Sequence, residues 1–289
     1  MNRLPAHTRV LIIRCLVEGM SIRSTARTAD VSKNTVLKLL CASGRACAAY
    51  QDAALRGLTC RRVEVDEIWS FVYVKQKNAP YAKNPPKLAG DAWTWTAMCP
   101  DSKLILSWRI GDRTSATAID FMDDVRSRLA HRVQLTSDGH IPYLEAVERA
   151  FGEDVDYAML VKHYGTTAED AREHYRGATR IPVQGNPRKD QVSTSGVERQ
   201  NLTMRMSMRR FTRRTNAFSK KVENHAHAVA LHFMHYNFVR IHRTIECSPA
   251  MAIGVDNHLW EIRDLVDMVE AHEPRKAKVV PIPLNLDPN

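Results

Sequence analysis

One stretch of the chain limits what the whole can fold into. Residues 62–74 are rich in β-branched and aromatic side chains over the length of a full strand, which predicts a strand buried on both faces. Asp66 lies in its middle, on the same face as Ile68 and Val72 by the two-residue period. A carboxylate is costly there unless a cation meets it. Asp66 is therefore either at a sheet edge facing a loop or a metal ligand.

The positive charge of the chain is concentrated in two segments. The formal net charge is +10, yet residues 1–62 alone carry a balance of +8 and residues 198–221 a balance of +7, so the remainder is net acidic. Two basic zones in an otherwise acidic protein favour a polyanionic partner. A solvated basic surface is the alternative.

The apolar residues and the cysteines exclude other classes. The chain has no run of eighteen apolar residues and no hydrophobic signal region at its start, so we expect no membrane association and a cytoplasmic location. The six cysteines are scattered without a C-x-x-C pair, which argues against a zinc ribbon and a disulfide framework.

The first forty residues predict three short helices. Ser21 is placed to cap the second helix and Ser32 the third, with a tight turn between them. This is the helix-turn-helix pattern, in which the last helix would present Lys33, Asn34 and Lys38 to the major groove of DNA. Short helices that merely pack together are the alternative, and the basic charge favours the DNA interpretation.

The middle of the chain predicts a mixed sheet covered by helices. Three strands form a meander, and helix and strand then alternate before a long basic helix that begins near residue 197. The strands are expected at 62–74, 92–98, 104–110, 133–137 and 157–161, whereas residues 163–191 fit no element. We divide the chain into a helix-turn-helix domain at 1–57, an α/β domain at 58–250, and a C-terminal helix with a loose tail at 251–289.

Two further acids join Asp66. Asp138 follows the strand at 133–137, and Glu198 opens the basic helix. Each has an ordinary alternative, because Asp-Gly is a common turn and Ser195 to Glu198 has capping-box spacing. As a set, however, an Asp within a strand, an Asp at a neighbouring strand end and a Glu on a crossing helix can converge on one edge of the sheet. Three carboxylates suit Mg²⁺ or Mn²⁺ and suit Zn²⁺ poorly.

Carboxylates arranged in this way support phosphodiester chemistry. Two divalent ions about 4 Å apart activate the attacking oxygen and neutralise the leaving one. Arg205 lies two helical turns after Glu198, with Asn201 between them on the same face. An arginine at that place could hold a substrate phosphate beside the metals.

The three acidic segments together resemble those of DDE transposases. The residues that carry the resemblance are 65–72, 136–139 and 195–202, continued at 209–220 and 236–242. Within that family the chain is similar to the bacterial insertion-sequence-one group, over roughly residues 8–255. Some members of the group carry an N-terminal zinc finger, whose spacing the cysteines here lack. End recognition would then rest on the helix-turn-helix alone.

The resemblance implies both a fold and an activity. The fold is an α/β, ribonuclease H-like mixed sheet flanked by helices, preceded by a small all-α helix-turn-helix domain. The activity is DNA cleavage at insertion-sequence ends followed by 3′-hydroxyl strand transfer, with two Mg²⁺ or Mn²⁺ ions held by Asp66, Asp138 and Glu198. Arg205 would match the basic residue that these enzymes place after the Glu.

The resemblance also implies partners. They are double-stranded DNA, at element ends and target, and further copies of the chain on that DNA, in a nucleoid-associated bacterial location. The residues expected to contact DNA are Lys33, Asn34, Lys38, Arg199, Asn201, Arg209, Arg210, Arg213 and Arg214.

Two rival functions stay open. One is a helix-turn-helix repressor or an inactive transposase relative, and the other is a nuclease that hydrolyses DNA without joining it. Glu67 should point away from Asp66 and be a poor ligand. The tryptophans at 69, 93, 95 and 108 are expected in the core or on the sheet surface, where one could stack on an unpaired base.

Overall fold

The strands form one mixed sheet, the arrangement expected for a ribonuclease H-like fold. The computed structural model describes residues 4–166, 174–212, 214–272 and 283–285. Within them, seven strands are ordered β6-β5-β4-β1-β2-β3-β7. They are β1 (Arg62–Val72), β2 (Gly90–Met98), β3 (Ile105–Gly111), β4 (Val133–Ser137), β5 (Val155–Gly165), β6 (His174–Gln184) and the short β7 (Leu284–Asn285).

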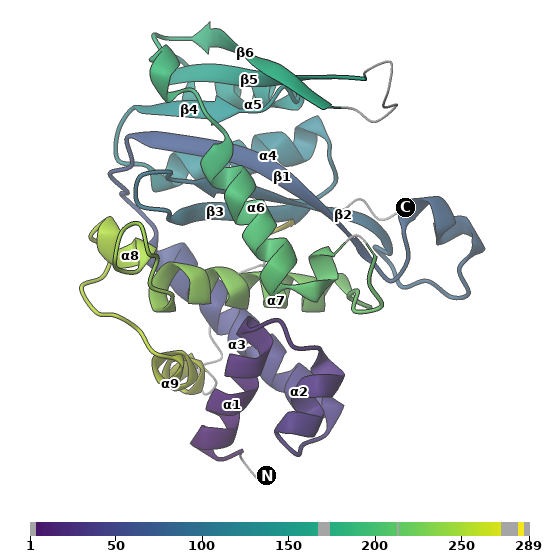
Figure 1. Cartoon of the computed structure of the whole chain (residues 1–289). Helices are drawn as coiled ribbons and strands as arrows, with labels where there is room; N and C mark the ends of the chain where they lie inside the picture. The colour runs from purple at the N-terminus through teal and green to yellow at the C-terminus, as the bar shows by residue number, and fades with distance from the viewer. Residues whose placement is uncertain (1–3, 167–173, 213, 273–282, 286–289) are drawn as a thin grey trace.

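Strand directions confirm the expected α/β fold class. β1, β2 and β3 form the antiparallel meander, and β4 and β5 then add parallel to β1 on its other side. α6 (Ser195–Ser207) crosses one face, and α4 (Ser115–Arg128) and α5 (Pro142–Phe151) cover the other (Figure 1). Under α4 and α5, the fully buried Trp95 packs against Phe121 and Tyr143. Burying side chains of this size contributes roughly 1.5–3 kcal/mol each.

The segment that fitted no predicted element completes the sheet. β5 is longer than expected, and β6 pairs with it antiparallel as a ribbon along the edge of the sheet. Most of the β6 side chains are exposed. The polar and apolar alternation that identifies a half-buried strand is therefore weak in this stretch.

The three N-terminal helices form as predicted. They are α1 (Ala6–Val17), α2 (Ile22–Thr28) and α3 (Lys33–Ala54). Ser21 accepts a hydrogen bond from the N–H of Ser24, and Ser32 accepts one from the N–H of Thr35, each at 3.1 Å. Both predicted caps are confirmed. α3 continues without a break through its alanine-rich half.

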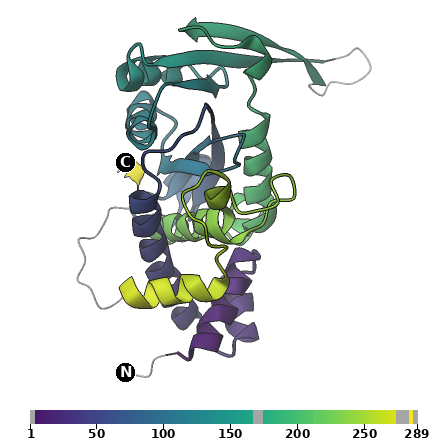
Figure 2. The same ribbon diagram turned by 90° about the vertical axis from the view of Figure 1, so that its left-hand side faces the viewer.

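A central helix lies between the sheet and the N-terminal helices (Figures 1 and 2). This helix, α7 (Val222–Met234), continues into a π turn at His235–Val239. α7 packs on α3 so closely that a Cβ at Gly44 would lie 2.5 Å from the Cα of His227. The short α8 (Pro249–Ala252) and then α9 (Ile262–His272) follow, and α9 packs on α1 and α3. The buried core is therefore continuous from these helices into the sheet.

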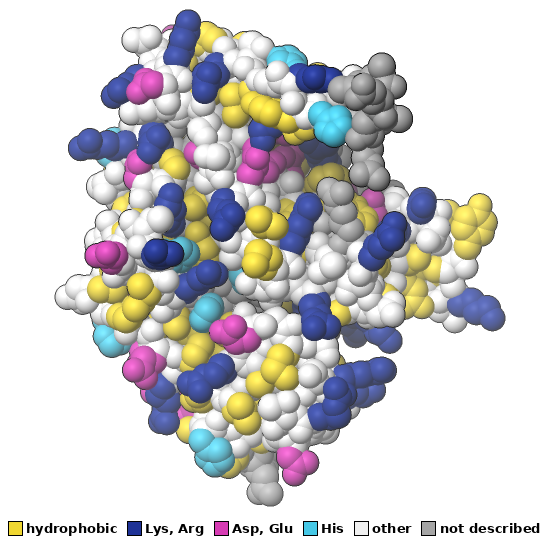
Figure 3. Space-filling model, viewed as in Figure 1, with side chains coloured by type: hydrophobic (Ala, Val, Ile, Leu, Met, Phe, Trp, Pro, Cys, Tyr) yellow, Lys and Arg dark blue, Asp and Glu magenta, His cyan; other side chains and the backbone are white. Residues whose placement is uncertain are grey.

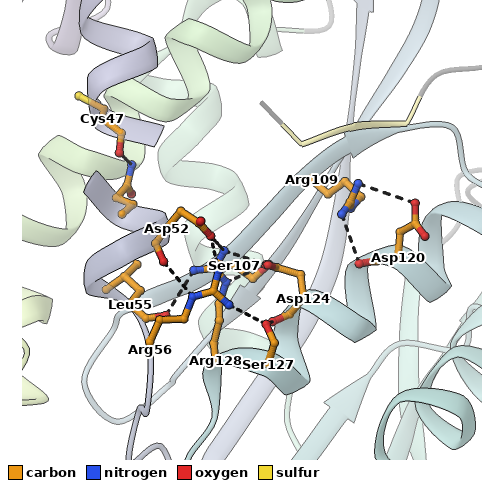
Figure 4. Close-up of polar contacts among 11 residues, drawn as sticks. Cys47, Asp52, Leu55, Arg56, Ser107, Arg109, Asp120, Asp124, Ser127 and Arg128 are labelled. Carbon is orange, nitrogen blue, oxygen red and sulfur yellow. Dashed lines mark hydrogen bonds and ion pairs between the residues drawn. The ribbon is translucent and has the colours of Figure 1, made fainter. Parts of the chain in front are cut away.

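The end of α3 is also tied to α4 by a buried arginine (Figure 4). The Arg128 guanidinium donates to Asp52 of α3 at 2.9 Å and to Asp124 of its own helix at 2.7 and 2.9 Å. It also donates to the carbonyl oxygen of Leu55 at 3.3 Å.

Among the described residues, no helix is long and apolar enough to cross a bilayer.

Candidate active site

Asp66, within β1, and Asp138, just after the end of β4, meet where the pairing of these two parallel strands stops. The register of β1 and β4 pairs Glu64 with Thr136, so two residues further on Asp138 comes opposite Asp66. One carboxylate oxygen from each, together with one from Glu67, lies within 4.8 Å of the others. Strand pairing therefore places both predicted aspartates side by side at the end of β4.

Asp66 is held by neutral hydrogen-bond donors. Its Oδ1 accepts the N–H of Glu67 and its Oδ2 accepts the amide of Asn201, each at 2.8 Å. Burial, and then the charge of Asp138, raise the pKa of Asp66 to about 6. Two carboxylates at such a distance repel each other by roughly 3–4 kcal/mol at an effective dielectric constant of 20. A bound cation would remove that repulsion.

Glu67 belongs to the same group, contrary to the expectation that it would be a poor ligand. Its side chain does leave β1 on the face opposite to Asp66, but Asp138 lies at the end of the sheet and is reached from both faces. Glu67 accepts from Nε of Arg113 at 3.2 Å and lies 3.4 Å from Nε2 of His140. Burial, and then the charges of Asp138 and Asp66, raise the pKa of Glu67 to about 8.

Glu198 approaches from α6. Its Oε1 accepts hydrogen bonds from Nζ of Lys162 on β5 and from the hydroxyl of Thr194. Glu198 lies outside the group of three carboxylates described above. Its charge nevertheless contributes to the raised pKa of Asp66, behind burial and Asp138. An acidic patch accordingly lies beneath the β5–β6 ribbon, with basic side chains around it (Figure 3).

The start of α6 is fixed by β1 and not by a capping box. Ser195 is already helical, so the predicted pairing between Ser195 and Glu198 does not form. Instead, Oε2 of the buried Glu64 accepts the N–H of Val197 at 3.0 Å. A Cβ on Gly196 would lie 2.8 Å from that same oxygen. Glu64 and Asp66 share one face of β1, so a single strand both carries the aspartate and anchors the helix of Glu198.

Residues predicted to contact DNA lie in two places. Arg199 is exposed on α6, Asn201 is buried with its amide on Asp66, and Arg205 is partly buried two turns beyond Glu198. A cavity of about 840 Å³ separates the N-terminal helices from the segment after α6. Its lining includes Lys33, Asn34, Arg209 and Arg210.

The other residues predicted to contact DNA differ in how exposed their side chains are. Lys38 and Arg214 are exposed, and Arg213 lies outside the described residues. Arg210 is partly buried, and its Nη1 donates to Oγ of Ser219 at 2.7 Å and to the carbonyl oxygen of Asn224 at 3.1 Å. Burial lowers the pKa of Arg210 to about 10. Arg210 therefore also anchors the segment that borders the cavity.

Sequence reasoning missed four side chains at the site. Glu64 carried a usable signal, because a second acid on the Asp66 face of a buried strand needs its own partner. No comparable signal in the sequence pointed to Lys162, Arg113 or His140. They follow or extend elements whose boundaries were uncertain, and only the sheet register brings them to the carboxylates.

Comparisons with known proteins give weak likenesses. No family model and no curated protein matches the chain. Several solved structures do, and two Mos1 transposase complexes are among them. The paired-end complex with the left transposon end has 11% identity over 54% of this chain and 60% of that one, with a TM-score of 0.23. The strand transfer complex has 11% identity over 80% of this chain and 78% of that one, also with a TM-score of 0.23. This chain thus spans less than two thirds of the first of them.

Proposed function

We propose that this chain is a DDE-type DNA transposase that cleaves DNA at the ends of an insertion sequence and joins the 3′-hydroxyl to target DNA. The observation that carries the proposal is the convergence of Asp66, within β1, and Asp138, just after the end of the adjacent β4, with Glu198 on the helix that crosses the sheet. The helix-turn-helix and the basic cavity beside it supply a DNA-binding surface. Cutting and joining two ends at one target would require more than one copy of the chain.

The donor set fits Mg²⁺ or Mn²⁺. Hard divalent ions prefer carboxylate oxygens, and Mg²⁺ binds them at about 2.1 Å, so ligands on opposite sides lie about 4.2 Å apart. The carboxylate oxygens within 4.8 Å of one another need only small side-chain movements to meet that distance. Asp66, Asp138 and Glu198 would hold two ions, with Glu67 as a further ligand. When bound, such ions activate a water or 3′-hydroxyl and neutralise the leaving oxygen.

The chain's own residues orient the reactants. Asn201 and the N–H of Glu67 fix both oxygens of Asp66. Glu64 fixes the helix that carries Glu198. Lys162, now paired with Glu198, lies where it can move to a phosphate oxygen of DNA. Arg205 would contact the same strand from α6.

Asp66→Asn tests the proposal on the full chain. The substrate is the DNA that flanks its coding frame, assayed with Mg²⁺ for nicked ends and for joined product. We expect wild type to cut and join, and Asp66→Asn to do neither while binding the DNA with affinity within about threefold of wild type. Cleavage that persists in Asp66→Asn contradicts the assignment of the triad.

The same assay separates the rival functions. A repressor or an inactive relative would bind the flanking DNA and never cut it in any divalent ion. A nuclease would cut it and yield no joined product when 3′-hydroxyl ends are supplied. Imperfect inverted repeats in the flanking DNA would favour transposase over repressor.

A further inference from the structure

Two tryptophans lie just beyond the helices that cover one face of the sheet. On that face, Trp95 is enclosed by Phe121 of α4 and Tyr143 of α5, with ring centroids 5.9 and 5.4 Å away. One register step further, Trp69 of β1 is paired with Trp93 of β2. Residues paired in this way project from the same face. Both of these indoles are only partly buried, whereas Trp95 is fully buried.

The aromatic surface continues onto a third chain segment. Phe71 lies 5.8 Å from Trp69, and Phe218 lies 5.2 Å from Phe71, measured between ring centroids. Phe218 reaches this position because Ser219 bridges Val72, which places the segment after α6 along the end of β1. We call Trp93, Trp69, Phe71 and Phe218 the aromatic row.

Cations flank the aromatic row. Nζ of Lys75 lies 5.5 Å from the ring centroid of Trp69, and Cζ of Arg113 lies 5.0 Å from that of Trp93. Arg113 also reaches Glu67 at 3.2 Å and Asp138 at 3.9 Å. The aromatic row is therefore joined to the carboxylate group by one side chain.

We propose that the aromatic row stacks an unpaired base of the DNA strand whose phosphodiester lies at the carboxylates. Two residues along a strand span about 6.8 Å, so Trp69 lies one such step from Glu67. Partly exposed rings with cations beside them combine the two features that hold single-stranded nucleic acid, a stacking surface and charges for its backbone. Core packing explains why Phe71 and Trp95 are buried aromatic residues. It does not explain why the paired indoles of Trp69 and Trp93 remain partly exposed. The proposal rests on DNA being the substrate, as proposed above.

Fluorescence of 2-aminopurine tests the proposal without catalysis. The probe is flanking DNA with 2-aminopurine in a short single-stranded overhang, mixed with the full chain in EDTA, and the matched blunt duplex is the reference. A stacked 2-aminopurine loses fluorescence, so we expect wild type to quench the overhang probe and to bind it more tightly than the blunt duplex. Trp69→Leu should abolish the quenching and weaken overhang binding about tenfold, with blunt binding unchanged. Trp69→Phe should retain most of both effects.

A matched control and a second variant keep the test decisive. Tyr81→Leu removes an aromatic ring that is 87% exposed and lies outside the aromatic row, and it should behave as wild type. If Trp69→Leu melts at a lower temperature than wild type, Trp93→Phe and Trp93→Leu repeat the comparison. Wild type that leaves the probe unquenched, or Trp69→Leu with an unchanged ratio of overhang to blunt affinity, overturns the proposal. Both results leave cleavage by wild type intact, whereas a chain that binds neither DNA overturns the proposed function.

Discussion

The acidic side chains on the two faces of β1 have different hydrogen-bond and charge partners. On the face toward α6, Asp66 is held by an amide and an N–H, and Glu64 by the N–H of Val197. On the face toward α4 and α5, Glu67 already has the guanidinium of Arg113 and the ring of His140. On the first face the two acids of β1 have only neutral donors, and Lys162 there pairs with Glu198 of α6; on the second face a cation of the protein reaches the β1 acid itself. Under the proposed function, Asp66 would therefore be an essential metal ligand of β1 and Glu67 an accessory one.

Loss of Glu198 should have the largest effect. Glu198→Gln keeps the shape and the oxygen that accepts from Lys162 but removes the charge that a divalent ion needs. Because a bound ion supplies several kcal/mol of transition-state stabilisation, we expect cleavage to fall on the order of 10³-fold. Single-turnover cleavage in Mg²⁺ measures this. A loss of less than tenfold would place the ions elsewhere.

Loss of Asn201 should have an intermediate effect. Asn201→Ala frees one oxygen of Asp66, and loss of a group that orients a metal ligand lowers metal affinity or activity about 10- to 100-fold. Titration of cleavage against Mg²⁺ should show a higher half-saturating concentration. Leu202→Ala, on the exposed side of the same helix, is the matched control. Equal Mg²⁺ dependence in both variants would mean that Asn201 has no part in orienting Asp66.

Substitution of Glu64 should mainly lower the stability of the fold. Glu64→Ala leaves the buried N–H of Val197 without an acceptor, which costs about 1–3 kcal/mol in the free energy of unfolding. Glu64→Gln keeps an oxygen there and should cost less. Urea denaturation of the two variants measures the difference. If they are equally stable, β1 does not anchor α6 through this hydrogen bond.

Glu67 should matter least for cleavage, and its effect should depend on pH. Because its pKa is raised to about 8 in the folded chain, the stability it contributes is complete below the unfolded value of 4.5 and is lost as the pH rises through about 8. Glu67→Gln should remove that loss, so the metal-free variant should exceed wild type by about 2–4 kcal/mol at pH 9 and match it at pH 4.

Cleavage by Glu67→Gln should stay within about tenfold of wild type, since the α6 face is untouched. Unfolding across this pH range and cleavage at pH 7 are the two measurements. A loss as large as that of Glu198→Gln would make the two faces of β1 equivalent.

Local pattern was enough to predict strands β1 to β4, the caps at Ser21 and Ser32, and the meeting of Asp66 with Asp138. Each depends on periodicity or on where a strand ends, which neighbouring residues determine. The ribbon of β5 and β6 was not predictable, because an edge strand with mostly exposed side chains has little apolar alternation. The roles of Lys162 and Arg113 were equally hidden, since each depends on partners 20 or more residues away that only the assembled sheet brings near.

The close contact at Gly44 has a consequence for how far from its bound sequence the proposed enzyme would cut DNA. α3 contacts α7 at backbone distance and is tied to α4 through Arg128, so under the proposed function the helix that would read DNA is packed firmly on the domain that carries the carboxylates. The distance along the DNA between the sequence that is bound and the bond that is cut would then be fixed by the folded protein. Substitutions that loosen this junction should scatter the cut positions before they abolish cutting.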